Sequence, residues 1–291
     1  MRVAGQSPPT ATNFAKVTRD TWEAFQVLHI GAVAEVSLIG SGKGNALGPA
    51  FWRESATLAQ ALGELATVRA IVLRGQGEHF SYGLDLAAMM TELQPLRAPD
   101  AGVLGREKLM ARITDMQDAI EAWARCPKPV VAAIGGWCIG GAMHLVAACD
   151  VRLCAASTQF SLREVRLAML PDLGALWRLP RIVGETHARH VALTGMDFDG
   201  ERAARMGFVT DCLESNAALF ERALLLAQTW ATLPALAVQG VKQAMNAASQ
   251  SSQTESLRAC ATWNTALLQS EDFAEAQAAF REKRPPHFRG E

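Results

Sequence analysis

The pair Gly140-Gly141 is the feature that most constrains how this chain can fold. It lies between an apolar run over residues 129–134, typical of a buried strand, and a helical pattern over residues 142–148 that follows at once. The first amides of a helix have no backbone partner, and the positive end of the helix dipole lies behind them. Because glycine has no Cβ, another molecule can approach these amides closely. The passage therefore predicts a strand, turn and helix whose turn can stabilise an oxygen that gains negative charge.

Two acidic side chains follow this turn. Glu164 and Asp172 stand in a segment otherwise dominated by apolar residues. Polarising donors with acids nearby are the minimum equipment for moving protons next to a carbonyl group. Ion pairing with Arg163, Arg166 or Arg178 is the alternative, since most acids near arginines are structural or solvated. The two interpretations stay open on sequence grounds.

A histidine lies one turn into the helix that follows Gly141. His144 is either a core residue whose polar atoms are satisfied or a catalytic group that faces the pocket. Its unperturbed pKa is near neutrality, which suits a base or a donor to substrate.

Charge and cysteine content limit the classes of ligand that the chain can bind. The chain of 291 residues carries 28 basic and 29 acidic side chains, a balance that gives no footprint for nucleic acid or an anionic membrane. An anionic ligand must therefore be held by local groups. The six cysteines form no C-x-x-C pair, so we expect no metal site, and buried reduced thiols instead.

The N-terminal sequence has no apolar run of the signal-peptide kind, and no stretch reaches the length of a membrane span. With the reduced thiols, this predicts a cytoplasmic protein with no membrane partner. A transit peptide remains an alternative, because the first twenty residues carry Arg2, Lys16 and Arg19 and one acid, Asp20.

The order of patterns predicts an α/β fold built from successive ββα units. Runs over 24–30 and 32–39 indicate a hairpin, 49–66 a helix and 70–74 an interior strand, and the loop 79–86 repeats the glycine bend of residues 135–141. Two such bends side by side could polarise one carbonyl oxygen. Two prolines predict a mobile loop over 90–101, before an amphipathic helix over 106–126.

The C-terminal part changes character. A helix broken at Pro180 is predicted over 174–182, then helices over 185–193 and 200–206. From about residue 215 only helical patterns remain, over 215–232, 234–250, 252–268 and 272–282. We therefore predict a loose arm over 1–20, a ββα core with the ligand site over 21–212, and a helical region over 213–291.

Short motifs over nearly the whole chain beyond residue 24 resemble the crotonase superfamily, also called the enoyl-CoA hydratase/isomerase family. The matching passages are Gly40-x-x-x-x-Asn45-Ala46, Phe80-Ser-x-Gly-x-Asp-Leu86, Ile139-Gly-Gly141, Ala148-Cys-Asp-Val-Arg152, Phe160-x-x-x-Glu164, Leu193-Thr-Gly195, Ser270-Glu-Asp272 and Ala279-Phe-x-Glu-Lys-Arg284. Each piece alone is weak, whereas the combination is specific. The resemblance implies the crotonase (ClpP/crotonase-like) fold, whose C-terminal helices join three chains, often as a trimer or a dimer of trimers.

The resemblance also implies an acyl-CoA thioester as the ligand, with no separate cofactor. By position, the backbone N–H groups of Leu84 and Gly141 would form the oxyanion hole. Further substrate contacts would come from these residues: Lys43, Ala46, Ser81, Tyr82, Gly83, Asp85, Gly140, Phe280 and Lys283. Of these, Phe280 and Lys283 would close over the nucleotide end from the tail of the same chain or from a neighbour.

Within the family, the central segment is most similar to the dienoyl-CoA isomerases, which carry two working acids eight positions apart. Glu164 and Asp172 stand at that spacing. Two departures accompany the match: His144 replaces a carboxylate of the hydratases and an Asp of the dienoyl isomerases, and Ala168 replaces a glycine.

The first interpretation is therefore double-bond isomerisation of a dienoyl-CoA, with Glu164 and Asp172 as proton carriers and His144 as a third candidate catalytic group. The alternative reaction is hydration of a 2-enoyl-CoA, with His144 in place of one acid. A non-catalytic acyl-CoA-binding protein is the alternative from another class, and RNA binding is disfavoured by the near-neutral charge.

Overall fold

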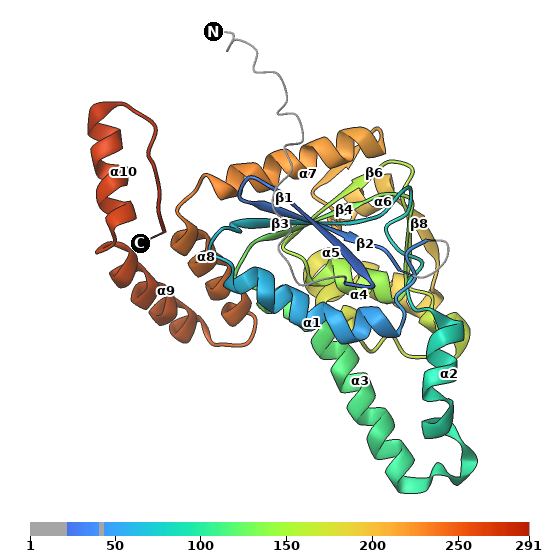
Figure 1. Cartoon of the computed structure of the whole chain (residues 1–291). Coiled ribbons are helices and arrows are strands. Elements are labelled where there is room, and N and C mark those ends of the chain that lie inside the picture. The colour runs from blue at the N-terminus through green and yellow to red at the C-terminus, as the bar shows by residue number, and fades with distance from the viewer. Residues whose placement is uncertain (1–21, 41–43, 291) are drawn as a thin grey trace.

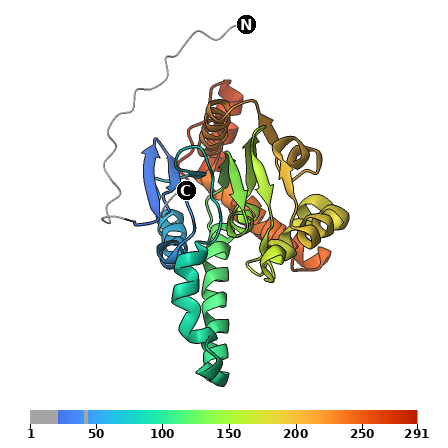
Figure 2. The ribbon, with the colours of Figure 1, turned by 90° about the vertical axis from the view of Figure 1, so that its right-hand side faces the viewer.

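The computed structural model describes residues 22–40 and 44–290. They form two β-sheets with helices on both faces of the larger one, and a pair of helices projects from this body (Figures 1 and 2). The predicted arm over 1–20 and Lys43 lie outside the described residues.

The larger sheet has the order β1-β2-β3-β4-β6-β9. Its strands are β1 (Phe25–Ile30), β2 (Val33–Leu38), β3 (Ala70–Gly75), β4 (Val130–Ile134), β6 (Val151–Ala155) and β9 (Asp211–Leu213). The pair β1 and β2 is antiparallel, as the predicted hairpin requires, and every later pairing is parallel. Parallel strands need crossover connections, which the intervening helices provide.

Alternation of side chains along these strands divides the core into two layers. One face packs against α7 (Asn216–Ala231) through Val72, Val131 and Leu153, which contact buried residues such as Leu219. The other face carries Ile71 and packs against α1 (Pro49–Glu64), α3 (Gly102–Arg125), α4 (Gly141–Ala148) and α5 (Ala175–Thr194). Although α7 lies in the predicted helical region, it covers the sheet, so the core extends beyond residue 212.

The second sheet consists of β5 (Trp137–Ile139), β7 (Gln159–Ser161) and β8 (Asp197–Asp199). The sequence analysis missed all three strands, because three residues are too few for a periodic pattern. Therefore α4 does not follow β4 at once, as we had expected: β5 stands between them. The unit of β4, β5 and α4 thus contributes one strand to each sheet before its helix, whereas β1 and β2, which precede α1, both belong to the larger sheet.

The last three helices, α8 (Ala235–Ala248), α9 (Gln253–Leu267) and α10 (Glu271–Glu282), lie close to their predicted ranges. Lys242 anchors α8: its buried ammonium group contacts Asp150 Oδ2 at 2.7 Å and the Lys128 carbonyl at 3.0 Å. By contrast, α9 has no buried residue, and Figure 1 shows α9 and α10 extending away from the sheets.

The loop predicted over 90–101 is wrong. Those residues belong mostly to α2 (Leu86–Arg97), which ends before the short 3₁₀ helix η1 (Pro99–Ala101). The side chain of Asp85 caps α2 by accepting the Ala88 N–H at 3.0 Å. Burial of Met89 and Leu93 holds the helix, and Pro95 lies in its last turn, so the hydrogen bond that proline cannot donate is lost only near the end of the helix.

The break predicted at Pro180 is also misplaced. The helix α5 continues through Pro180 and is interrupted at Gly184, whose φ of 76° lies outside the helical range. Glycine adopts that conformation at little cost, so the kink occurs there. The helix α6 (Gly200–Arg205) lies close to its predicted range.

No single helix in the described part of the chain is long and apolar enough to cross a membrane. Only α7 and α8 together meet that length and composition, and they are bent by 108° at their junction.

Candidate active site

Strand pairing brings the two glycine bends together. Ser81 pairs with Cys138 in parallel, through the Ser81 N–H to the Trp137 carbonyl at 2.9 Å and the Ile139 N–H to the Ser81 carbonyl at 3.1 Å. Leu84 and Gly141 each lie three positions further along their own segment. The register of this short pairing therefore predicts that their amides lie close together.

The geometry of the bends bears this out. A methyl group added to Gly141 would lie 3.7 Å from the Leu84 nitrogen, and one added to Gly83 would lie 3.2 Å from the Gly141 nitrogen. Within the residues that the structure describes, neither the Leu84 nor the Gly141 amide donates a hydrogen bond to the protein. Gly141 is also the first residue of α4, whose positive dipole end adds to the local potential.

Glycine is required at both bends. Gly83 has a φ of 79°, and a Cβ there would collide with the carbonyl oxygen of Ile139. Gly140 has a φ of 51°, a value that residues with a Cβ rarely adopt.

Two polar side chains hold the first bend in place. The Ser81 hydroxyl donates to the Asn45 carbonyl at 2.7 Å and accepts the Gly83 N–H at 3.0 Å. The Asn45 amide donates to the carbonyls of Gln76 at 2.9 Å and His79 at 2.8 Å. The sequence analysis quoted Asn45 only as part of a motif and gave it no role; its place in a glycine-rich loop was the available signal, because Asn tolerates its φ of 51°.

The acidic side of the site begins at Glu164, the first residue of the 3₁₀ helix η2 (Glu164–Leu167). Its Oε1 lies 3.2 Å from Nε2 of His144, and a Cβ on Gly140 would lie 3.2 Å from the same oxygen. Its other oxygen, Oε2, is buried and has no hydrogen-bond partner among the described residues. Glu164 therefore lies beside the second bend with one oxygen held and one unpaired.

His144 is both buried and in contact with the candidate acid. His144 belongs to α4, and only 1% of the residue is exposed. Its Nδ1 accepts the Ala175 N–H at 3.0 Å. His144 is therefore a buried histidine whose two ring nitrogens both have partners, the first of the two interpretations. The contact with Ala175, 31 residues away, had no signal in the sequence.

The arginines that the sequence offered as ion-pair partners are engaged elsewhere. Arg178 contacts Glu121 through two hydrogen bonds, of 2.6 and 2.7 Å. Arg163 contacts Asp197 at 2.8 Å. The salt bridges of the described residues therefore leave Glu164 with His144 as its partner.

Asp172 lies near the same group but closer to solvent. Partial burial raises the pKa of its carboxyl group above the ordinary value of 3.8, and the negative charge of Glu164 raises it further. Its backbone carbonyl accepts a hydrogen bond from Gln117 of α3 at 2.7 Å. Sequence reasoning missed Gln117, because a polar residue on an amphipathic helix gives no sign of a contact 55 positions away.

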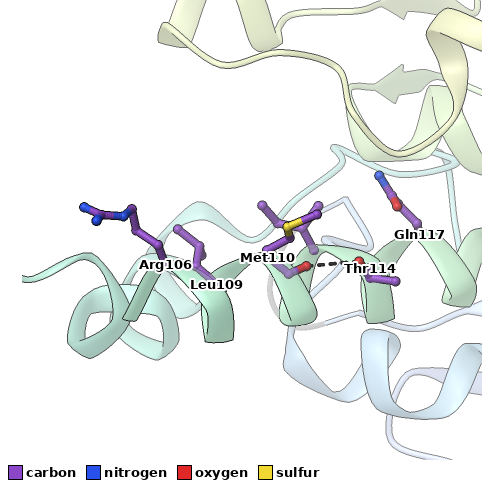
Figure 3. A pocket seen from close by; sticks show the side chains of 6 residues that line it. Arg106, Leu109, Met110, Thr114 and Gln117 are labelled. Carbon is purple, nitrogen blue, oxygen red and sulfur yellow. Dashed lines mark hydrogen bonds between the residues drawn. The ribbon is translucent and has the colours of Figure 1, made fainter. Parts of the chain in front are cut away.

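A cavity of about 280 Å³ runs along α3 from Gln117, lined also by Arg106, Leu109, Met110, Ile113 and Thr114. Figure 3 shows these side chains following the helix. The lining is mainly apolar apart from its two ends. A larger cavity of about 780 Å³ includes the other end of α4, around Ala148 and Lys242, and none of the predicted site residues lines it.

The other predicted contacts fall into two groups. Ala46 and Tyr82 lie at the first bend, where the Tyr82 N–H donates to the Gly44 carbonyl at 2.7 Å and its ring packs 5.1 Å from His79. Phe280 and Lys283, at the end of α10, are remote: Figure 1 shows α10 on the opposite side of the body from α2. Within one chain, Phe280 and Lys283 therefore do not contact the site formed by the two bends.

Comparison with known proteins shows the family of the chain. The profile of the family described as "Enoyl-CoA hydratase/isomerase" matches residues 29–291. The peroxisomal Delta(3,5)-Delta(2,4)-dienoyl-CoA isomerase of Arabidopsis thaliana is 39% identical over 84% of this chain and 88% of its own. A probable enoyl-CoA hydratase of Rhodobacter capsulatus is 35% identical over 84% and 90%, respectively.

A solved structure of similar shape extends the match. The crystal structure of a putative enoyl-CoA hydratase from Streptomyces coelicolor superimposes with a TM-score of 0.86 and 29% identity, over 97% of this chain and 100% of that one. The family match covers both bends and the segment that carries Glu164 and Asp172. This chain therefore belongs to the enoyl-CoA hydratase/isomerase family and has the crotonase fold.

Proposed function

We propose that this enzyme isomerises a 3,5-dienoyl-CoA to the conjugated 2,4-dienoyl-CoA. The observation that carries the proposal is the unpaired Oε2 of Glu164 beside the free amides of Leu84 and Gly141, with Asp172 nearby. The dienoyl-CoA isomerase named above, similar over most of the chain, supports the same reaction.

The chemistry follows from these positions. The Leu84 and Gly141 N–H groups would donate to the thioester oxygen as it gains charge, a contribution of roughly 3 to 4 kcal/mol per donor. One carboxylate removes a proton from C2, and the electrons of that C–H bond move into the conjugated system. The other carboxyl group delivers a proton to C6, which leaves double bonds at C2 and C4. Proton count and charge balance without water.

The acidic pair suits this exchange. A carboxyl group that donates a proton must hold it at working pH, and the raised pKa of Asp172 moves that group in the required direction. Glu164 has Oε2 available while Oε1 is held.

The direct test uses purified protein with two substrates. A 3,5-dienoyl-CoA should gain the ultraviolet absorbance of a conjugated dienoyl thioester, whereas a 2-enoyl-CoA should keep its absorbance. Turnover of the 2-enoyl-CoA alone would establish hydration, the activity in the name of the Rhodobacter relative. Coenzyme A affinity without turnover of any thioester would instead identify a binding protein.

We propose further that the acyl chain beyond the reacting carbons lies in the cavity along α3. Gln117 and Arg106 mark its ends and stand eleven residues apart, about 16 Å along a helix. The apolar side chains of Leu109, Met110 and Ile113 between them suit hydrocarbon. A medium-chain dienoyl-CoA should have the higher kcat/KM than a six-carbon one, and equal values would remove this part of the proposal.

We propose a homotrimer, or a dimer of trimers, for the assembly. The C-terminal helices leave large apolar side chains uncovered, with Met245 71% and Phe280 87% exposed. A neighbouring copy would cover them and bring Phe280 and Lys283 to the nucleotide end of a partner's ligand. Light scattering after gel filtration measures the state directly, and a monomer at micromolar concentration would contradict it.

We also propose the cofactor requirement and the cellular location. Coenzyme A would enter as part of the substrate, with no separate cofactor, which activity in dialysed protein without additions would test. A cytoplasmic location is supported by the free cysteines of the described residues, whereas the Arabidopsis relative is named peroxisomal. A fluorescent fusion to the C-terminus of the full chain distinguishes cytoplasm from organelle.

A further inference from the structure

The tautomer of His144 follows from its two hydrogen bonds. The Ala175 N–H, 3.0 Å from Nδ1, can only donate, so Nδ1 must present a lone pair. The proton of the neutral ring is then on Nε2, which faces Oε1 of Glu164 at 3.2 Å. Glu164 accepts this hydrogen bond as a carboxylate.

A charged imidazolium does not fit this arrangement. It would place an Nδ1–H against the Ala175 N–H, two donors face to face inside the protein. The ring is buried between α4 and the start of α5, so solvent does not relieve that conflict. The contact of His144 with Glu164 is therefore a hydrogen bond from a neutral donor, and the ring has no free lone pair for a substrate proton or a water hydrogen.

We propose that His144 is a positioning residue that holds Glu164 by Oε1 and leaves Oε2 to exchange protons with the substrate. The proposal rests on the function proposed above. Its physical basis is that both ring nitrogens are committed, one to the backbone of α5 and one to the carboxylate.

A pair of substitutions separates the two hydrogen bonds of the ring. In His144→Gln, an amide nitrogen can occupy the place of Nε2 and still donate to Glu164. In His144→Asn, the shorter amide can accept the Ala175 N–H but cannot reach Glu164. We expect His144→Asn to lower kcat for isomerisation by about 10- to 100-fold, the effect of one hydrogen bond to a charged group, with KM within about twofold.

The His144→Gln variant should retain kcat within about threefold, because the donor to Glu164 is kept. Thermal unfolding of both variants establishes that each is folded. Equal kcat losses in the two folded variants, or a loss in KM alone for His144→Asn, would overturn the positioning role.

A measurement without turnover distinguishes failure of this inference from failure of the proposed function. Nitrogen NMR of ¹⁵N-histidine-labelled protein at about pH 8, where an ordinary imidazole is neutral, reads the tautomer, and the His144→Gln spectrum assigns the signal. The Nε2–H tautomer is expected, and a proton on Nδ1 would overturn the inference. If the tautomer is as expected but wild-type protein does not isomerise dienes, the proposed function fails and the assignment of the tautomer does not.

Discussion

The two halves of the candidate site are built in different ways. The pair of bends presents backbone amides, fixed by the pairing of Ser81 with Cys138 and by glycines that exclude any side chain. The acidic half presents side chains, on a 3₁₀ turn and the loop after it, where burial decreases from Glu164 to Asp172. Charge stabilisation thus depends on strand register, whereas proton transfer depends on a few side-chain contacts.

The difference separates what the fold fixes from what substitution can change. A backbone donor survives most amino acid replacements and is lost only if the bend moves. A carboxylate and its partner can be altered singly, with the bends intact. We therefore expect substitutions in the acidic half to change the type of reaction. Loss of all activity can result from substitutions in either half.

The strongest test of the acidic half is Glu164→Gln. The amide keeps the shape of the side chain but cannot carry a proton, so kcat should fall about 10³-fold with KM little changed. Steady-state kinetics with a 3,5-dienoyl-CoA measures this. The exposed Glu185, which pairs with Arg189 at 2.9 Å, gives the control Glu185→Gln, with no expected effect. Activity of Glu164→Gln within tenfold of wild type would remove Glu164 from the mechanism.

The bends are tested by Gly83→Ala. A Cβ would collide with the Ile139 carbonyl and move the Leu84 amide, so kcat should fall about 10²-fold, as for the loss of one oxyanion donor. Gly77 is a matched control, because its φ of 75° is similar but no atom lies within 4 Å of an added Cβ. If Gly77→Ala and folded Gly83→Ala lose equal activity, backbone strain and not the position of the amide explains the effect.

The partly buried carboxyl group of Asp172 should make the free energy of unfolding depend on pH. The pKa of Asp172 is raised in the folded protein, so the folded state binds this proton more tightly than the unfolded state. The stabilising effect of that proton is complete below the ordinary pKa of 3.8 and is lost as pH rises through the higher folded value. Ionised Asp172 therefore destabilises the fold slightly at neutral pH.

Replacement of this group reveals the effect. Asp172→Asn should unfold at a higher urea concentration than wild type at neutral pH, and its advantage should shrink as pH falls toward 3.8. Dienoyl-CoA isomerisation should decrease in the same variant. A stability advantage that does not change with pH would show that Asp172 is not the group responsible.

The smallest effect on activity is expected at Gln117, where α3 contacts the backbone of Asp172. Gln117→Leu removes the donor to the Asp172 carbonyl and should lower kcat/KM by about 3- to 10-fold, the range of one neutral hydrogen bond. Thr114→Val is the control: it lines the same cavity, and its hydroxyl donates only within α3, to the Met110 carbonyl at 3.1 Å. Losses of similar size in both variants would indicate a change in cavity lining and not in Asp172.

The bends were the more predictable half. A buried strand, glycines and a helix are local signals, and they located Gly140 and Gly141 from sequence alone. The loop over residues 79–86 followed from repetition of the same pattern, whereas the resemblance to the family singled out the Leu84 amide within it. The pairing that joins the bends involves strands of one to three residues, which carry no periodicity, so the second sheet was not predicted.

The acidic half was predicted in residue type and not in arrangement. The resemblance drew attention to Glu164 and Asp172 by their spacing, and the structure brings both near His144. The partners Ala175 and Gln117 come from α5 and α3, and such long-range contacts leave no local pattern. The error over residues 90–101 has the same origin, because Asp85 and the buried Met89 outweigh the effect of a late proline on α2.

The pairing of Ser81 with Cys138 closes the base of an excursion that contains both α2 and α3. Residues between these two positions can be inserted or deleted at the far end without moving either bend. Descendants of such a chain could lengthen or shorten the excursion and so accept new acyl groups, while inheriting the catalytic amides unaltered. Diversity of substrates would then require no reinvention of the chemistry.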